Sequence, residues 1–180
     1  RERKAKTMVA VLKDYLKKPL SALSLLNVGG SAGLIDNYLA DYFHSIVSID
    51  IDAPAIRKAK RKFKKANLEF KVGDALNLEY ENNTFDIVIC SQVYEHVPSP
   101  EKMMAEILRV LVPGGVCYFA ASNRLMWLEP HYNLPLLSVI PRPLAHVYVK
   151  RAQKADYYHE LHYTYWGLKK LVKRFSIIDY

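Results

Sequence analysis

Leu-Leu-Asn-Val-Gly-Gly-Ser-Ala-Gly, residues 25–33, is the stretch that decides the fold of this chain. An apolar run ends here in a glycine-rich turn, and apolar residues then recur at helical spacing from Leu34 to Phe43. This order predicts a buried strand, a tight loop and an amphipathic helix. Because glycines let a ligand approach bare backbone N–H groups at a helix N-terminus, the stretch also predicts a ligand site.

Strand-like and helix-like segments alternate along the rest of the chain. The expected strands are residues 24–28, 46–51, 68–72, 85–90 and 116–121. The expected helices are a first one over 8–16, one from the glycines to about 43, a basic one after 51, and one that starts after Ser99 and ends at 113–115. Strands made almost wholly of apolar residues are typical of a parallel sheet covered on both faces. We therefore expect an α/β fold: a Rossmann-like, doubly wound, mostly parallel sheet in three layers, α/β/α, with its site where the first strand ends.

The length of 180 residues predicts a single domain over residues 1–180. Residues 22–121 would form its core. Residues 122–166, rich in proline, tyrosine and histidine, would fold over the strand ends as a lid or acceptor-binding insertion. A helix over 166–174 and a short strand over 175–179 would follow. Since the chain starts without methionine and stops there, we expect a fragment whose C-terminal strands are incomplete.

Composition narrows the class of protein. Cys90 and Cys117 lie in apolar runs, which is typical of buried thiols in a reducing compartment, so we expect a cytoplasmic protein. The basic N-terminus lacks the apolar core of a signal peptide, and prolines interrupt the longest apolar stretch, so no transmembrane segment is expected. The net charge is +8, with seven basic residues over 57–65. These form either a solvated helix face or a patch for nucleic acid or for the surface of an anionic membrane.

The glycine loop does not fit two common nucleotide-binding patterns. In a dinucleotide G-x-G-x-x-G motif with Gly30 and Gly33 as the last two glycines, Val28 would stand in the place of the first. The Gly-Lys-Ser/Thr that ends a Walker loop is also absent. The loop therefore indicates a different ligand.

In these residues the chain resembles the class I S-adenosylmethionine-dependent methyltransferases, most of all their broad type 11 small-molecule group. The first motif of that family, an acidic residue, an aliphatic residue and G-x-G-x-G, is similar to residues 27–33. The resemblance continues in order through 49–52, 73–75, 85–88, 94–97 and 109–115, and covers about residues 22–121. There are two departures. Asn27 stands where the family usually has an acid, which removes a charge that would attract the ammonium group of the cofactor, and Ser31 replaces the middle glycine.

The resemblance implies S-adenosylmethionine as the cofactor and a set of residues that bind it. The loop would pass beside the methionine part, an acid would accept from the ribose hydroxyls, a second acid would meet the adenine, and two polar residues would lie beside the sulfonium. In that order, the matching positions are Asn27, Gly29, Gly30 and Gly33; Asp50 and Ile51; Asp74 and Ala75; and Ser91 and Gln92. Asp50 and Asp74 have an alternative role as caps of the turns that follow them.

The reaction implied is methyl transfer by in-line displacement to a small-molecule acceptor, for which the protein mainly aligns the reactants. A hydroxyl acceptor would also need a general base. His96 is the first candidate and His131 the second, each with a structural role as the alternative. His159 and His162 are three residues apart, but no third ligand of matching spacing is evident. We therefore expect surface histidines and no metal site.

The acceptor is only partly indicated. The Asn/Asp-Pro-Pro-Tyr signature for methylating base amines is missing, because residues 91–94 read Ser-Gln-Val-Tyr. Residues 129–151 mix apolar, aromatic and basic side chains, which suits an amphipathic or anionic acceptor that is lipid-linked, glycan or quinone-like. Two alternatives stay open: a nucleic-acid methyltransferase that uses the basic surface, and a non-catalytic domain that binds the cofactor poorly because of Asn27 and Ser31.

Overall fold

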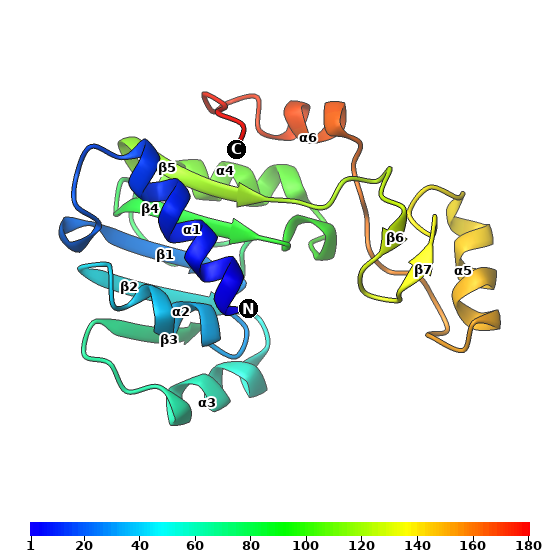
Figure 1. The fold of residues 1–180 in the computed structure, drawn as a ribbon, viewed down its shortest axis with the longest axis horizontal. Coiled ribbons are helices and arrows are strands. Elements are labelled where there is room, and N and C mark those ends of the chain that lie inside the picture. Colours follow the sequence, from blue (N-terminus) through cyan, green and yellow to red (C-terminus); the bar gives the residue numbers. More distant parts are fainter.

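The computed structural model describes residues 1–180 and is built on one five-stranded sheet. The strands are β1 (Ser24–Val28), β2 (Ser45–Asp50), β3 (Leu68–Val72), β4 (Phe85–Ser91) and β5 (Leu111–Ala120). They lie in the order β3-β2-β1-β4-β5, and every neighbouring pair is parallel (Figure 1). The order reverses beside β1, so the expected doubly wound α/β fold is confirmed.

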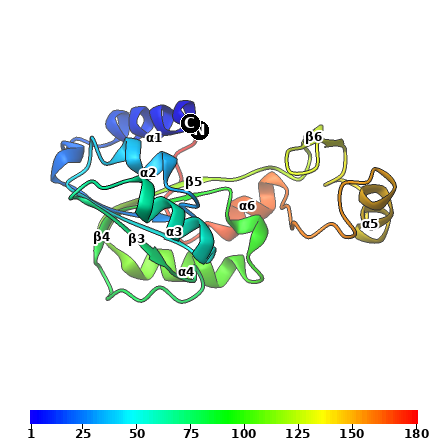
Figure 2. The same ribbon diagram turned by 90° about the horizontal axis from the view of Figure 1, so that it is seen from below.

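Helices cover both faces of this sheet. On one face are α1 (Glu2–Tyr15), the short turn η1 (Leu20–Ala22), α2 (Leu34–Leu39) and α3 (Ala53–Lys62); on the other are α4 (Pro100–Val110) and α6 (Tyr165–Leu171) (Figure 2). Met8 and Leu12 of α1 pack with Leu25 of β1 in the first core. Met103 and Ile107 of α4 pack with strand residues in the second. Burial of these two apolar faces stabilises the sheet between them.

The helix after the glycines is shorter than expected. It ends at Leu39, and residues 40–42 form a turn. The side-chain amide of Asn67 donates to the carbonyls of Ala40 and Phe43, at 2.8 and 3.0 Å. Since these bonds satisfy carbonyl groups that a longer helix would have used, they fix the end of α2.

Two expectations at the end of the sheet are wrong. The helix α4 ends at Val110 rather than at the glycines, because β5 starts at Leu111 and a register shift opposite residues 85–87 absorbs the extra residues. Residues 175–179 form no strand. That segment runs toward α1, where the Tyr180 hydroxyl donates to Asp14 Oδ2 at 2.8 Å, and so pairs with no strand. As a result, β5 is an edge strand in these 180 residues.

The region after β5 forms a small lobe. It contains the hairpin of β6 (Leu128–Glu129) and β7 (Leu134–Pro135) and the helix α5 (Arg142–Arg151). Its own apolar cluster includes Leu137, Ala145 and Val149, all fully buried. The lobe lies beyond the carboxyl ends of β4 and β5, joined to the core by two stretches of chain (Figure 1).

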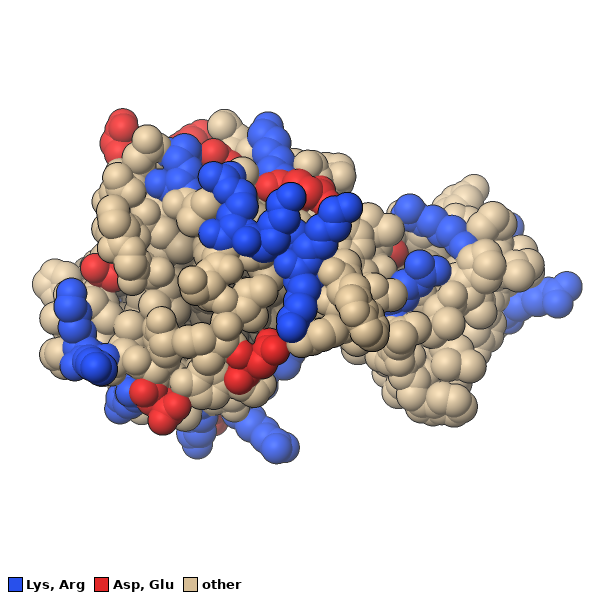
Figure 3. All heavy atoms as spheres, turned by 90° about the horizontal axis from the view of Figure 1, so that it is seen from above, with Lys and Arg blue, Asp and Glu red and all other residues tan.

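Basic side chains are spread over separate surfaces. Lysines and arginines gather over the face that carries α6, and a second group lies on the lobe (Figure 3). The basic residues of α3 are exposed and lie at the opposite end of the core from α6. Cys90 and Cys117 are free thiols, and burial raises the pKa of Cys117 to about 12. None of the helices has the length and apolar character needed to cross a membrane.

Candidate active site

Backbone hydrogen bonds bring the glycine loop against the ends of β2 and β3. The N–H groups of Gly29 and Gly30 donate to the carbonyl of Ile49 at 2.9 and 3.0 Å. The Ser31 N–H donates to Asp50 Oδ2 at 2.8 Å. The Gly73 N–H donates to the Asp50 carbonyl at 3.1 Å. The residues expected to bind the cofactor therefore converge at the carboxyl ends of the strands.

Packing requires glycine at two positions of the loop. Gly33 has φ of +75°, and a Cβ atom there would lie 2.6 Å from the ring of Phe70. Gly29 has φ of +80°, and its Cβ would lie 2.5 Å from Val93 Cγ2. Ser31, which replaces a glycine of the family motif, also adopts a left-handed conformation, at φ of 51°. The loop thus keeps the conformation of a glycine-rich turn despite the serine.

Asp50 and Asp74 both cap the turns that follow them. Asp50 Oδ1 accepts from the N–H of Asp52 at 2.9 Å, and Asp74 Oδ1 accepts from the N–H of Leu76 at 2.8 Å. A carboxylate offers about four acceptor positions, so these bonds leave room for a ligand. Both roles given to these acids are therefore compatible.

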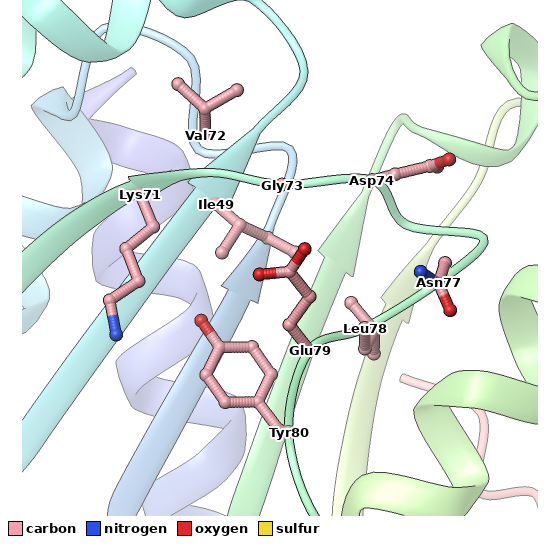
Figure 4. Close-up of a pocket in the computed structure, with 9 residues that line it drawn as sticks. All are labelled: Ile49, Lys71, Val72, Gly73, Asp74, Asn77, Leu78, Glu79 and Tyr80. Carbon is pink, nitrogen blue, oxygen red and sulfur yellow. The ribbon is translucent and has the colours of Figure 1, made fainter.

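A pocket opens where β3 ends (Figure 4). Lys71, Glu79 and Tyr80 gather around Ile49 in it, whereas the side chain of Asp74 points away from them. Just past β2, Ile51 is 75% exposed. Ile49, Ile51 and Tyr80 therefore offer apolar surface near Asp50 and Asp74.

Ser91 and Gln92 lie where β4 ends. Gln92 has φ of 57°, and its Oε1 accepts from the Ser122 hydroxyl at 2.5 Å. Both residues line a hollow under the first turns of α1, together with Arg3 and Lys4. Ser91 and Gln92, which are expected beside the sulfonium, are therefore covered by the basic N-terminal end of α1.

The two candidate bases lie together. His96 is in the short turn η2 (Tyr94–His96) of the core, and His131 follows β6 in the lobe. Their rings meet edge to face with centroids 4.9 Å apart. His131 Nδ1 lies 2.6 Å from Glu129 Oε1. A carboxylate in this position holds the imidazole in one orientation and leaves Nε2 for a substrate.

Glu129 is fully buried and well satisfied. Its Oε2 accepts from the N–H groups of His131 and Tyr132, each at 2.8 Å, and its Oε1 lies 3.3 Å from His162 Nε2. Burial raises the pKa of Glu129, but the hydrogen bonds from His131 and Tyr132 outweigh it and hold the pKa below its usual value. The carboxylate is therefore ionised and able to orient a base.

The expectation of two surface histidines is wrong for His162, which is only 6% exposed, whereas His159 is exposed. Ligand atoms of Glu95, His96 and His131 lie within 4.8 Å of one another, and so do those of Glu129, His131 and His162. These spacings are short enough to hold a divalent cation. In the second set, however, hydrogen bonds already satisfy Glu129. Sequence spacing missed the grouping because the lobe creates it.

Three buried acids were not expected at the site. Glu129 precedes His131 by two residues, and that closeness was an available signal. Glu95 is 1% exposed, and neither of its carboxylate oxygens has a partner. Asp36 is fully buried in α2, and its Oδ1 accepts from Asn27 Nδ2 at 2.6 Å.

Comparison with known proteins agrees with this arrangement. A family described as a methyltransferase domain matches residues 26–119. A ubiquinone biosynthesis O-methyltransferase of Coxiella burnetii is 29% identical over 107 residues, which are 58% of this chain and 46% of that protein. A phthiotriol/phenolphthiotriol dimycocerosates methyltransferase of Mycobacterium leprae is 35% identical over 106 residues, 56% of this chain and 38% of that protein. The chain thus matches less than half the length of these relatives.

Solved structures share the fold. A S-adenosylmethionine-dependent methyltransferase of Methanosarcina mazei aligns over 91% of this chain and 82% of its own, with a TM-score of 0.70 and 22% identity. A putative methyltransferase of Bacillus halodurans aligns over 94% of this chain and 67% of its own, with a TM-score of 0.68 and 19% identity. The alignments extend well beyond the residues that the family match covers.

Proposed function

This chain belongs to the class I S-adenosylmethionine-dependent methyltransferases, and we propose that it transfers a methyl group to a hydroxyl of a small amphipathic acceptor. The observation that carries the acceptor chemistry is the 2.6 Å contact between the buried Glu129 and His131, beside His96. A hydroxyl is a weak nucleophile until it loses its proton, and an oriented imidazole is suited to take that proton.

The acids around the loop suit the cofactor of this family. Asp50 and Asp74 each keep acceptor positions after capping their turns, and both lie at strand ends beside the exposed Ile51. Ribose hydroxyls and the exocyclic amine of adenine are donors, so carboxylates match them. Ile51 would supply apolar surface to the adenine ring. Asn27, Gly29, Gly30 and Gly33 would hold the methionine part, Ala75 the adenine, and Ser91 and Gln92 the sulfonium end.

The chemistry divides between cofactor and protein. When bound, the cofactor supplies an activated methyl group and a good leaving group. His131 Nε2 would accept the proton of the acceptor hydroxyl, while Glu129 would stabilise the imidazolium that forms. His96 would hold the acceptor against the ring of His131. Such a base contributes about 10²–10⁴-fold to the rate.

The surroundings favour an amphipathic or anionic acceptor. Leu125 and Trp127, on the lobe, are 60% and 71% exposed, and Arg3 and Lys4 line the hollow beside Ser91 and Gln92. The ubiquinone and phthiotriol dimycocerosate methyltransferases among the relatives are named for lipid-like compounds. A lipid-linked or quinone-like phenol would match both surfaces, and contact of the lobe with a membrane surface would bring such an acceptor to the site.

A nucleic-acid acceptor is less well supported. The basic groups of α3, α6 and the lobe lie on separate parts of the surface, so they do not line one groove. The affinity for a nucleic-acid backbone grows with the number of phosphates that lysines and arginines neutralise together. Binding to RNA that weakens steeply with salt would nevertheless favour this alternative.

Calorimetry with S-adenosylhomocysteine tests cofactor binding. We expect micromolar binding that Asp50→Ala abolishes; absence of binding would contradict the proposed function and favour a non-catalytic domain. Transfer of radiolabelled methyl groups to phenolic lipids, glycans and RNA would then identify the acceptor. Labelling of RNA alone would refute a small-molecule acceptor.

Substitution of the base tests the mechanism. His131→Gln should lower the rate about 10²–10⁴-fold without changing the affinity for S-adenosylhomocysteine. His159→Gln, in an exposed histidine of the same lobe, is the matched control and should leave the rate unchanged. Equal methyl-transfer rates for the two variants would show that His131 is not the general base.

A further inference from the structure

The end of β1 carries an amide where this family usually carries an acid. Asn27 is 5% exposed, and its Nδ2 donates to Asp36 Oδ1 at 2.6 Å. Asp36 itself is fully buried. The charge that position 27 lacks is therefore present nine residues later, in direct contact with Asn27.

The second oxygen of this carboxylate is unpaired. Asp36 Oδ2 has no hydrogen-bond partner, and neither has the nearby buried hydroxyl of Ser48. A Cβ atom on Gly30 would lie 3.0 Å from Asp36 Oδ2 and 1.9 Å from Ser48 Oγ. Both groups therefore lie against the backbone of the glycine loop at Gly30.

An unpaired buried carboxylate is costly to the fold. Asp36 forms no ion pair, since no lysine, arginine or histidine lies within 4.0 Å of it. Burial is the main reason that its pKa rises to about 6, and the negative charge of Asp50 adds to this, while the hydrogen bond from Asn27 and the nearby hydroxyl of Ser48 oppose it. An asparagine could accept the same hydrogen bond from Asn27 without the charge. The hydrogen bond from Asn27 therefore does not by itself explain why position 36 is an aspartate rather than an asparagine.

Asp36 also fixes the direction of the Asn27 amide. Because Nδ2 donates to Asp36, Oδ1 of Asn27 faces the other way. That oxygen accepts no hydrogen bond within the protein and is not sealed from solvent. The end of β1 thus carries a neutral acceptor with no partner in the protein, and a buried carboxylate lies on the other side of the same amide.

We propose that Asn27 and Asp36 together replace the single acid of the first motif: Asn27 Oδ1 binds the ammonium group of the cofactor, and Asp36 orients that amide and supplies the opposing charge. The inference rests on the proposed function, since it needs S-adenosylmethionine as the ligand. Asp36 is a positioning residue, because it acts through Asn27. Gly29, Gly30 and Gly33 keep their proposed place beside the methionine part.

Two ligands separate this role from a structural one. S-adenosylhomocysteine carries the amino-acid ammonium, whereas 5′-methylthioadenosine shares the nucleoside and the sulfur but has no ammonium. By calorimetry, Asp36→Asn should weaken binding of S-adenosylhomocysteine about 10- to 100-fold, the range for a hydrogen bond to a charged group. Its binding of 5′-methylthioadenosine should stay as in the wild type.

A charge swap gives the second arm. The double variant Asn27→Asp/Asp36→Asn returns the acid to the usual position and should recover most of the affinity for S-adenosylhomocysteine. Asp41→Asn removes an exposed acid that pairs with Lys65 just after α2, and should change neither affinity. The thermal unfolding of each variant checks that it is folded.

The outcomes are distinct. Equal weakening of both ligands by Asp36→Asn, unchanged affinity for S-adenosylhomocysteine, or a folded double variant that stays weak would each overturn the role of Asp36. If the wild-type protein bound neither S-adenosylhomocysteine nor 5′-methylthioadenosine, the proposed function would be refuted, and the role of Asp36 with it.

Discussion

Asp36→Asn should make the folded protein more stable, and by an amount that depends on pH. The pKa of Asp36 is about 6 in the folded chain and 3.8 ordinarily. Between these values the folded state holds a proton that the unfolded state has released, so a rise in pH destabilises the wild type. The destabilisation is absent below pH 3.8 and complete above pH 6. An asparagine at position 36 does not titrate, so the variant is not destabilised in this way.

The gap between the two pKa values corresponds to about 3 kcal/mol at neutral pH, of which about half is present at pH 5. For a chain of this size, about 3 kcal/mol raises the midpoint of thermal unfolding by roughly 6–12 °C. The side chains that shift the pKa of Asp36 are Asn27, Ser48 and Asp50. All three are unchanged in the variant, so the difference between the two proteins isolates the one carboxylate.

Urea unfolding of both proteins at pH 5, 6, 7 and 8 measures this difference. We expect the advantage of the variant to grow from pH 5 to pH 7 and then to level off. Asp41→Asn, at an exposed pair with Lys65, is the control and should change stability by at most about 1 kcal/mol. A stability difference between Asp36→Asn and wild type that is the same at every pH would refute the argument, because an unpaired buried charge must titrate.

Three further substitutions test other parts of the structure. Gly33→Ala should lower the free energy of unfolding by about 1–3 kcal/mol, because φ is +75° and an aromatic ring occupies the Cβ position; urea unfolding at the wild-type level would contradict this. The Tyr94 hydroxyl accepts from the Tyr163 N–H at 3.1 Å. Tyr94→Phe should therefore lower the free energy of unfolding by about 1–3 kcal/mol and speed proteolytic cleavage between core and lobe. An unchanged rate of cleavage would show that this hydrogen bond does not hold the two parts together. Glu129→Gln should lower the methyl-transfer rate less than loss of His131 does, with cofactor affinity unchanged in calorimetry; full activity would show that the base needs no buried charge.

The strands were predictable because their signal is local. β1 and β3 have the bounds that the apolar runs indicated, residues 24–28 and 68–72. A run of apolar residues between turn signals needs no knowledge of distant partners. The segment over 175–179 has a similar pattern and forms no strand, since a strand also needs a neighbour with free backbone groups.

The inner face of α2 was harder to predict. The apolar pattern started at Leu34, which is 43% exposed, while Asp36 is fully buried. Asp36 and Leu39 are both buried and lie three residues apart in α2, so position 36 belongs to the inner face of the helix. A pattern that counts only apolar residues passes over an acid that points inward.

The grouping of the proposed base with its partners could not be predicted, because it depends on the lobe. His96 and His131 were both identified as candidates, but their contact needs two parts of the chain to meet. Glu129 and His162 are 33 residues apart and approach to 3.3 Å. Neither periodicity nor a motif encodes that distance, because it arises from the way the lobe folds back on itself.

The two connections between core and lobe would give the proposed reaction an order. Since His96 belongs to the core and His131 to the lobe, a swing of the lobe that admitted an acceptor would also pull the two imidazoles apart. The proposed base would then be separated from His96 while the space between core and lobe was open to water. Because two stretches of chain join the lobe to the core (Figure 1), such a swing would return the same pair of rings to contact. Catalytic competence and exclusion of solvent would thus be reached in a single movement.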